Sequence, residues 1–140
     1  FNLTGKTALI TGASRGIGAS AAREFAAAGA NVVLAARTSD EIQAIAAEIG
    51  PKALAVTCDV SRYDDVVQAV NAAQTRFGGL DILVNNAGVI DPISHLAESD
   101  TEGWGRAIDI NVKGVYHGLR AAIPVMEGRG GVIVNISSGA

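Results

Sequence analysis

The sequence predicts an α/β fold, in which a doubly wound parallel sheet carries helices on both faces. Short apolar segments alternate along the chain with longer segments of helical periodicity, which is the pattern of repeated βαβ units. A glycine-rich turn joins the first apolar segment to an alanine-rich helical segment, as it does in many doubly wound sheets. Since crossovers between parallel strands are right-handed, we expect the strand order 3-2-1-4-5 within a single domain that spans residues 1–140.

The five expected strands are rich in Val, Ile, Leu and Ala, because a parallel strand is buried on both of its faces. They are predicted at residues 6–11, 32–36, 53–58, 81–85 and 132–136. Helices are predicted at residues 16–28, 40–49, 62–77 and 102–126, and the turn formers in residues 89–100 predict a loop. Pro124 is expected to kink or end the last helix near it.

Composition and charge exclude several classes of function. With 49% apolar and 18% charged residues, the 140-residue chain is typical of a globular domain with a sizeable core. Its net charge of −3 argues against binding to nucleic acid or to an anionic membrane, and no apolar run approaches the roughly 18 residues of a transmembrane helix. The single cysteine, Cys58, cannot form an internal disulfide, which favours a cytoplasmic location. We expect Cys58 to be buried at a strand end.

The turn after the first strand is the most informative segment. Gly12, Gly16 and Gly18 stand in the spacing G-x-x-x-G-x-G. Glycine permits a tight turn, a close approach of the backbone to a pyrophosphate, and close packing of the helix on its strand. The start of the following helix offers unpaired N–H groups to phosphates, so the turn predicts a dinucleotide site. A plain glycine-rich turn between strand and helix is the alternative at this point.

Polar or glycine-rich residues follow all five expected strands. They are Thr11 and Gly12, Arg37, Asp59, the segment 85–88, and Ser137 with Ser138. In a doubly wound sheet the carboxyl ends of the strands lie along one edge, and ligands bind there between strands 1 and 4. We therefore expect these residues to converge on a single crevice, which favours the dinucleotide site over a plain turn.

These motifs resemble those of the short-chain dehydrogenase/reductase family, in its standard-length branch, and the resemblance covers the whole chain. The matching segments are Thr11 to Gly18 (TGASRGIG), Asp59 after the third strand, Asn85 to Gly88 (NNAG), Asn111 to Gly114 (NVKG) and Asn135 to Ser138 (NISS). The resemblance implies a Rossmann-like fold and hydride transfer between a nicotinamide cofactor and the carbonyl or secondary alcohol of a small molecule. A non-catalytic nucleotide-binding or regulatory module on the same fold is the alternative.

The resemblance also implies catalytic roles for two residues. Asn111 would hold a water in a proton relay, and Ser138 would hydrogen-bond the substrate oxygen. An asparagine is unfavourable inside a helix, which points to a role beyond structure, although an asparagine on a solvated face is the alternative. Ser137 is the structural alternative to Ser138.

The residues expected to bind the cofactor follow from the same motifs. They are Gly12, Ser14, Arg15, Gly16, Ile17, Gly18, Arg37, Asp59, Val60, Asn86, Ala87 and Gly88. The resemblance places the pyrophosphate at the glycine turn, the adenine amino group on Asp59 with Val60 beside it, and the adenosine along residues 86–88. A cap for the next helix is the alternative role of Asp59. Asn85 is expected to tie neighbouring strands together.

The end of the second strand predicts the choice of cofactor. An acidic residue there would bind the ribose 2′-hydroxyl of NAD and repel a 2′-phosphate, but this position is Ala36, followed by Arg37. Arg15, in the glycine turn, would face the same phosphate. Because guanidinium groups bind phosphate through charge-assisted hydrogen bonds, we expect NADP(H) to be favoured over NAD(H). In the alternative, either arginine is a solvated surface charge.

The family's active site is completed by a Tyr-x-x-x-Lys pair that this sequence does not match. Val67 stands four positions after Tyr63. Arg120 stands four positions after Tyr116, and both tyrosines precede Ser138. We therefore expect the natural chain to continue by on the order of 100 residues. The 140 residues alone are expected to lack dehydrogenase activity.

The predicted helix 102–126 is expected to cover the sheet and also to bind a partner. Its apolar stripe consists of Ile108, Val112, Val115, Leu119, Ile123 and Met126, and Trp104, Tyr116 and Ala122 are expected to extend the apolar surface. Since this helix packs against its symmetry mate in the family, we expect a homodimer or homotetramer. The alternative is that all of this surface is core. No metal site is expected, because His95, Glu98 and His117 lack further ligands at suitable spacing.

Overall fold

The computed structural model describes residues 1–138 and shows a five-stranded parallel sheet. The strands are β1 (Thr7–Thr11), β2 (Asn31–Ala36), β3 (Ala53–Thr57), β4 (Ile82–Asn85) and β5 (Val132–Asn135). Their order is β3-β2-β1-β4-β5, and every neighbouring pair is parallel, as the sequence predicts. Each strand agrees with its predicted range to within one residue at either end. The domain predicted over residues 1–140 includes two residues outside the described part.

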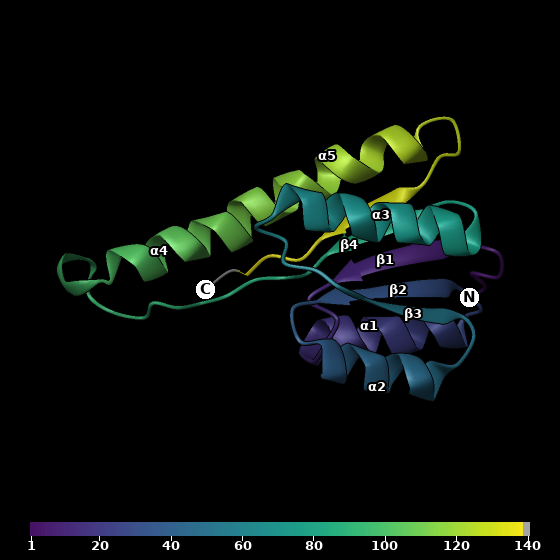
Figure 1. The fold of residues 1–140 in the computed structure, drawn as a ribbon, viewed down its shortest axis with the longest axis horizontal. Coiled ribbons are helices and arrows are strands. Elements are labelled where there is room, and N and C mark those ends of the chain that lie inside the picture. The colour runs from purple at the N-terminus through teal and green to yellow at the C-terminus, as the bar shows by residue number, and fades with distance from the viewer. Residues whose placement is uncertain (139–140) are drawn as a thin grey trace.

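Helices cover both faces of the sheet (Figure 1). They are α1 (Gly16–Ala27), α2 (Ser39–Ile49), α3 (Tyr63–Phe77), α4 (Thr101–Ile108) and α5 (Gly114–Met126). Helices α1 and α2 pack on one face, and α3 and α5 pack on the other. Because side chains alternate along a strand, Ala8 and Ile10 of β1 join the core beneath α1 and α2, whereas Leu9 joins the core beneath α3 and α5. All three are fully buried, which explains why β1 is a continuous apolar run.

The helix predicted over residues 102–126 is not one regular α-helix. A π-helical turn, η2 (Asp109–Lys113), joins α4 to α5, and its hydrogen bonds span one residue more than those of an α-helix. The sequence does not predict this turn, because apolar spacings of three and four residues fit both kinds of helix. Pro124 lies near the end of α5, which stops at Met126, as expected.

The buried side of this helix also differs from the expected stripe. The buried residues recur at steps of four and are mostly small: Ile110, Gly114, Gly118, Ala122 and Met126. Ala122, which the sequence predicts to extend the outer surface, is fully buried, whereas Val112 and Ile123 of the predicted stripe are exposed. The small side chains let α5 approach the sheet closely, while the larger Val112 and Ile123 point away from it.

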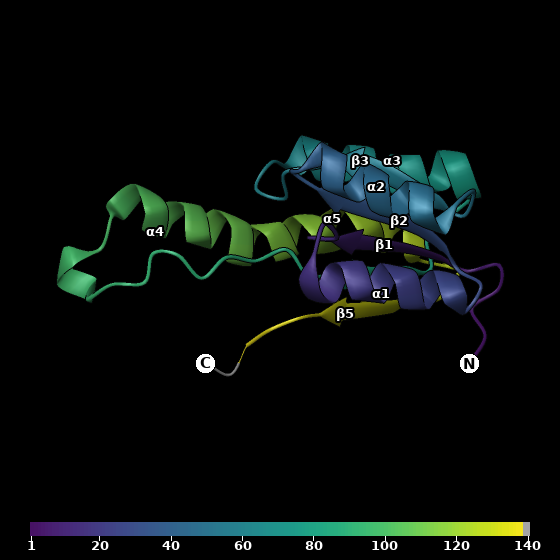
Figure 2. The ribbon, with the colours of Figure 1, turned by 90° about the horizontal axis from the view of Figure 1, so that it is seen from below.

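Helix α4 and the loop before it extend away from the sheet as an arm (Figures 1 and 2). The loop holds a short 3-10 helix, η1 (Leu96–Glu98), and α4 begins where the Asp100 side chain accepts the Gly103 N–H over 2.9 Å. Trp104 on the arm and Tyr116 on α5 are 53% and 60% exposed. In residues 1–138, no helix has the length and apolar character needed to cross a membrane.

Candidate functional site

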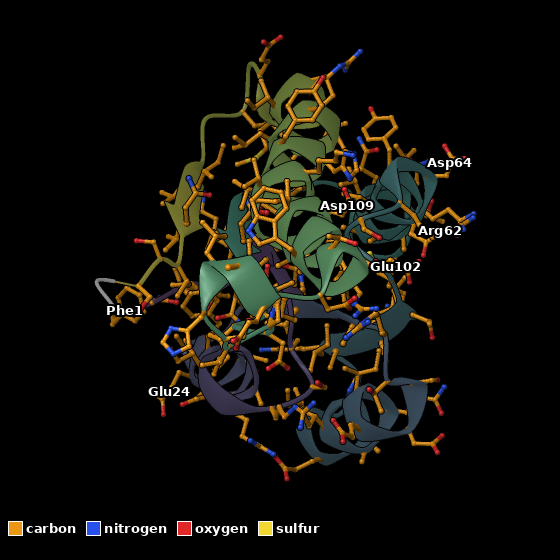
Figure 3. The ribbon with its side chains drawn as sticks, turned by 90° about the vertical axis from the view of Figure 1, so that its left-hand side faces the viewer. Phe1, Glu24, Arg62, Asp64, Glu102 and Asp109 are labelled. Atoms are coloured by element: carbon orange, nitrogen blue, oxygen red, sulfur yellow. The ribbon has the colours of Figure 1, made fainter. Side chains whose placement is uncertain are left out.

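A cleft of about 260 Å³ lies at the carboxyl ends of β1 to β4. The expected cofactor-binding residues that line it are Gly12, Ser14, Arg15, Arg37, Asp59, Val60, Asn86, Ala87 and Gly88. The predicted convergence on one crevice is therefore present for the first four strands. Figure 3 looks onto this edge of the sheet, with Arg62 labelled at the start of α3. Ser138, after β5, is exposed and does not line this cleft.

Two glycines bring the turn after β1 against the turn after β4. Gly12 has a φ of +61°, and a Cβ on this residue would stand 2.8 Å from the Cα of Ala87. A Cβ on Gly18 would overlap the carbonyl oxygen of Gly12 and would stand 2.6 Å from Asn86 Nδ2. Any larger side chain at these two positions would therefore push α1 and both turns apart.

The N-terminus of α1 lies in the glycine turn, with its first N–H groups not capped by a side chain. Arg15 occupies the N-cap position without a capping hydrogen bond, and the first turn contains no acidic residue. This end of the helix therefore carries a positive partial charge that no side chain neutralises. Gly16, Ile17 and Gly18 form this first turn but do not line the cleft, and Ile17 is 62% exposed.

The Thr11 hydroxyl joins the ends of β1 and β4. Its oxygen accepts the backbone N–H groups of Asn86 and Ala87 over 3.0 and 3.1 Å, and its proton is donated to the Val84 carbonyl over 3.4 Å. The Asn86 side chain returns a hydrogen bond to the Gly12 carbonyl over 3.1 Å. One buried hydroxyl and one amide thus fix both turns that line the cleft.

Asp59 lines the cleft just after the end of β3, and hydrogen bonds fix its carboxylate. Its Oδ1 accepts the backbone N–H and the hydroxyl of Ser61 over 3.0 and 2.7 Å. Partial burial acts to raise the pKa of Asp59, but the hydrogen bonds from Ser61 and the charges of Arg37 and Arg62 outweigh it and hold this pKa below its ordinary value. The N-cap position of α3 belongs to Arg62, so Asp59 does not cap this helix.

Cys58 stands in the wall of the same cleft and is 2% exposed. Burial raises the pKa of its thiol to about 12, with smaller contributions from the nearby carboxylates of Asp65 and Asp59. The prediction of a buried cysteine at a strand end is confirmed, and the thiol is protonated at neutral pH.

Asn111 sits in the π-helical turn and binds the chain after β4 through both atoms of its amide. Its Oδ1 accepts the Val89 N–H, and its Nδ2 donates to the Val89 carbonyl, each over 2.8 Å. Asn111 is exposed, as in the alternative of an asparagine on a solvated face, but its amide is engaged by the backbone of Val89, which lines the cleft. Gly88 leaves room for this contact, since a Cβ there would stand 3.3 Å from Asn111 Oδ1.

Asn85 ties neighbouring strands together, as predicted. Its Nδ2 donates to Oδ1 of Asn135 over 2.9 Å, which links the ends of β4 and β5. Asn85 does not line the cleft, in agreement with its omission from the cofactor-binding set.

Five residues that line the cleft lie outside the predicted cofactor-binding set. They are Ala36, Thr38, Cys58, Val89 and Ile110. Four of them directly flank an expected residue or segment, so widening each motif by one residue would have included them. Ile110 comes from the π-helical turn, and the neighbouring Asn111 was the signal for it. In the described residues, no group of three or more His, Cys, Asp or Glu side chains is placed to hold a metal ion.

Three known proteins illustrate what the chain is similar to. It is 46% identical over 142 residues to a trans-4-hydroxycyclohexanecarboxylate dehydrogenase of Sinomonas cyclohexanicum, covering 95% of this chain and 54% of that protein. It is 42% identical over 137 residues to a 3-alpha-(or 20-beta)-hydroxysteroid dehydrogenase of Mycobacterium bovis, covering 97% of this chain and 52% of that protein. A crystal structure of a Brucella melitensis 3-ketoacyl-(acyl-carrier-protein) reductase complexed with NADH gives a TM-score of 0.92 at 42% identity, covering 96% of this chain and 58% of that one.

The matches cover nearly all of this chain but only part of each relative. The chain spans about half the length of the curated relatives it matches. The family model for short chain dehydrogenases matches residues 6–140, which include the glycine turn, the NNAG segment and Asn111. Together with the sheet order and the relatives above 40% identity, this match shows that the chain belongs to the short-chain dehydrogenase/reductase family.

Proposed function

We propose that this chain is the cofactor-binding part of an oxidoreductase that moves a hydride between a nicotinamide cofactor and the carbonyl or secondary alcohol carbon of a small molecule. The observation that carries the proposal is the single cleft formed by the glycine turn, Asp59 and residues 86–88. The relatives named above are dehydrogenases and a reductase, so they give no support to a non-catalytic module. A single domain over residues 1–140 is part of the same proposal.

The cleft fits an anionic dinucleotide. The uncapped N–H groups of α1 and the guanidiniums of Arg15 and Arg37 are suitable partners for phosphate. In the proposal, the pyrophosphate and ribose bind along Gly12, Ser14, Arg15, Gly16, Ile17 and Gly18. Asp59 accepts the adenine amino group beside Val60, and its lowered pKa supports this role because the carboxylate stays ionised at neutral pH. Asn86, Ala87 and Gly88 line the adenosine side.

The proposed catalytic residues orient a carbonyl and help to move a proton. When bound, the cofactor supplies or accepts the hydride at its nicotinamide ring. Ser138 donates a hydrogen bond to the substrate oxygen, and Asn111, whose side chain is tied to the backbone of Val89 in the cleft wall, holds a water in the proton relay. Neither side chain titrates near neutral pH. We therefore propose that a Tyr-x-x-x-Lys pair delivers the proton and that residues 1–140 alone are inactive.

NADP(H) is the proposed cofactor. Ala36, at the end of β2, lines the cleft where an acidic residue would repel a 2′-phosphate, and Arg15 and Arg37 line it too. The two guanidiniums, together with an alanine in place of a carboxylate at the end of β2, favour the phosphorylated cofactor. The NADH in the Brucella melitensis structure belongs to that reductase.

We also propose a homodimer or homotetramer that forms through α4 and α5. The support is the exposed apolar surface of Trp104, Val112, Tyr116 and Ile123, since apolar area of this kind marks interfaces between subunits. A cytoplasmic location is proposed on the ground that Cys58 is an unpaired thiol.

The test uses the full chain, by which we mean the full-length protein that includes the proposed Tyr-x-x-x-Lys pair. It is titrated with NADPH and NADH, and a panel of ketones is then added. We expect saturable binding and oxidation of the reduced cofactor by at least one ketone. Gly12→Val should abolish binding, because its Cβ would overlap Ala87, whereas Gly105→Ala, in open space on α4, should not affect binding. Binding without turnover of any carbonyl would favour the non-catalytic module, and absence of binding would refute the proposal.

A further inference from the structure

His117 on α5 contacts the back of the cleft wall. Its Nδ1 lies 2.7 Å from the carbonyl oxygen of Val60. Because a carbonyl can only accept a hydrogen bond, Nδ1 carries the proton and donates it. Val60 lines the cleft and is 7% exposed, whereas His117 does not line the cleft. The histidine therefore reaches the cleft through Val60.

The same face of α5 also fixes the Val60 side chain. A Cβ on Gly114 would stand 2.7 Å from Cγ2 of Val60, so the valine side chain packs directly on the helix backbone. Gly114 and His117 are three positions apart and lie on one side of the helix. Val60 is thus held at its carbonyl and at its side chain by neighbouring residues of a single helix.

The histidine ring is itself held in place by two aromatic rings. The His117 ring centroid is 5.6 Å from that of Tyr63, at the start of α3, and 5.9 Å from that of Tyr116. The ring planes are inclined at 59° and 53°, which are tilted arrangements within the range that aromatic pairs favour. This packing favours a ring orientation in which Nδ1 faces Val60.

We propose that His117 is a positioning residue for the adenosine half of the cofactor. By donating its Nδ1–H to Val60, it sets the position of the wall on which the adenine packs and of Asp59, the preceding residue. The inference rests on the proposed function, which places the adenine beside Val60. Since the contact lies on the adenosine side, His117 affects the affinity for adenosine nucleotides and leaves the nicotinamide end unchanged.

The test compares His117→Leu with His117→Asn in the full chain. Leucine removes the donor, whereas the asparagine amide can place an N–H close to the position of Nδ1. We expect His117→Leu to weaken the binding of NADP⁺ and of adenosine 2′,5′-bisphosphate by about 3- to 10-fold, the range of one net hydrogen bond. His117→Asn should recover most of this loss. Nicotinamide mononucleotide binding and kcat at saturating cofactor should stay unchanged in both. His95→Leu, at an exposed histidine, is the matched control.

Several results would overturn the inference. Wild-type affinity in His117→Leu would do so, as would equal losses in the leucine and asparagine variants or a matching loss for nicotinamide mononucleotide. If the leucine variant does not fold, nitrogen NMR of the wild-type His117 ring tests the inference instead. A spectrum that shows an unprotonated Nδ1 would contradict the hydrogen bond to Val60. If the wild type binds no nucleotide, the proposed function fails, whereas unaltered nucleotide binding in a folded His117→Leu variant defeats only the inference about His117.

Discussion

The Asn85 side-chain oxygen lies against Gly118, in the space that a Cβ on Gly118 would occupy. Asn85 is 3% exposed, and its Nδ2 is bound to Asn135, so the amide cannot turn away without breaking the link between β4 and β5. Among residues 1–138, no hydrogen-bond donor reaches Asn85 Oδ1. Gly118 therefore sets how closely α5 approaches the sheet.

Gly118→Ala should lower the free energy of unfolding by about 1–3 kcal/mol, the usual cost of overpacking a core. This loss should appear although alanine is the better helix former by about 1 kcal/mol. Urea unfolding of the full chain measures it. Gly105→Ala is the matched control, because a Cβ there meets open space, and it should leave the stability unchanged or raise it. Equal stability of the Gly118→Ala variant and the wild type would contradict the contact with Asn85.

Thr11→Val should destabilise the chain by about 2 kcal/mol or more, because it leaves the N–H groups of Asn86 and Ala87 without their acceptor. Valine has nearly the same shape as threonine, so packing changes little. Thr11→Ser keeps the hydroxyl, so its loss in the free energy of unfolding should be clearly smaller. Chemical denaturation and cofactor titration of both variants provide the check. A serine variant as unstable as the valine variant would show that the methyl group matters more than the hydrogen bonds.

The stability of the chain should depend on Asp59 in acid. The pKa of Asp59 is lower in the folded state than in the unfolded state, so its contribution is fully present above the ordinary pKa of about 3.9. It is lost as the pH falls through the lower, folded pKa. Between about pH 6 and pH 3, the free energy of unfolding should fall more steeply in the wild type than in Asp59→Asn. Ser61→Ala should be intermediate, and parallel curves would contradict the lowered pKa.

Cys58 should resist thiol reagents in the folded chain. With its pKa raised to about 12, only about one thiol in 10,000 is ionised at pH 8, and the side chain is buried as well. Ellman's reagent should therefore label Cys58 slowly in buffer and rapidly in urea. Cys58→Ala removes the thiol and gives the background rate of the assay. Rapid labelling under native conditions would show that this wall of the cleft opens.

Arg37→Asp should reverse the proposed cofactor preference. The substitution replaces a cation at the cleft with a carboxylate that accepts a ribose hydroxyl and repels a 2′-phosphate. We expect kcat/KM to favour NADPH over NADH in the wild type and to favour NADH in the variant. Arg76→Asp, far along α3 and outside the cleft, controls for the change in net charge. Preference for NADH in the wild type, unaltered by Arg37→Asp, would refute the proposal.

Much of the fold was predictable because strands of a parallel sheet must be apolar and helices must start and stop at recognisable residues. Gly29, Gly50 and Gly78 all have positive φ and follow the first three helices, which explains the accuracy of those boundaries. The convergence of Gly12, Asp59 and residues 86–88 followed from topology alone, since all carboxyl ends meet at one edge.

The rest depended on packing that a sequence does not show directly. Ile110 and Gly114 turn toward the core, whereas Val112 turns away, because a π-helical turn intervenes and because small residues allow a closer approach than large ones. The bonds of Asn111 to Val89 could not be predicted either, since the partner is a backbone group 22 positions away. Local periodicity gives no information on such a contact.

The π-helical turn makes the length of this segment as important as its residues. A π-helical hydrogen bond spans one residue more than an α-helical one, so this turn holds one residue more than the same turn of a regular α-helix. Removing one residue from 109–113 would therefore let a regular α-helix form while α5 keeps its phase relative to α4. Gly114 and Gly118 would keep their contacts with Val60 and Asn85, whereas the wider turn that carries Asn111 toward Val89 would be lost. A single-codon deletion here should therefore cost mainly the Asn111 contact, whereas the same deletion within α5 would rotate the residues after it by about 100° and turn the buried side of the helix away from the sheet.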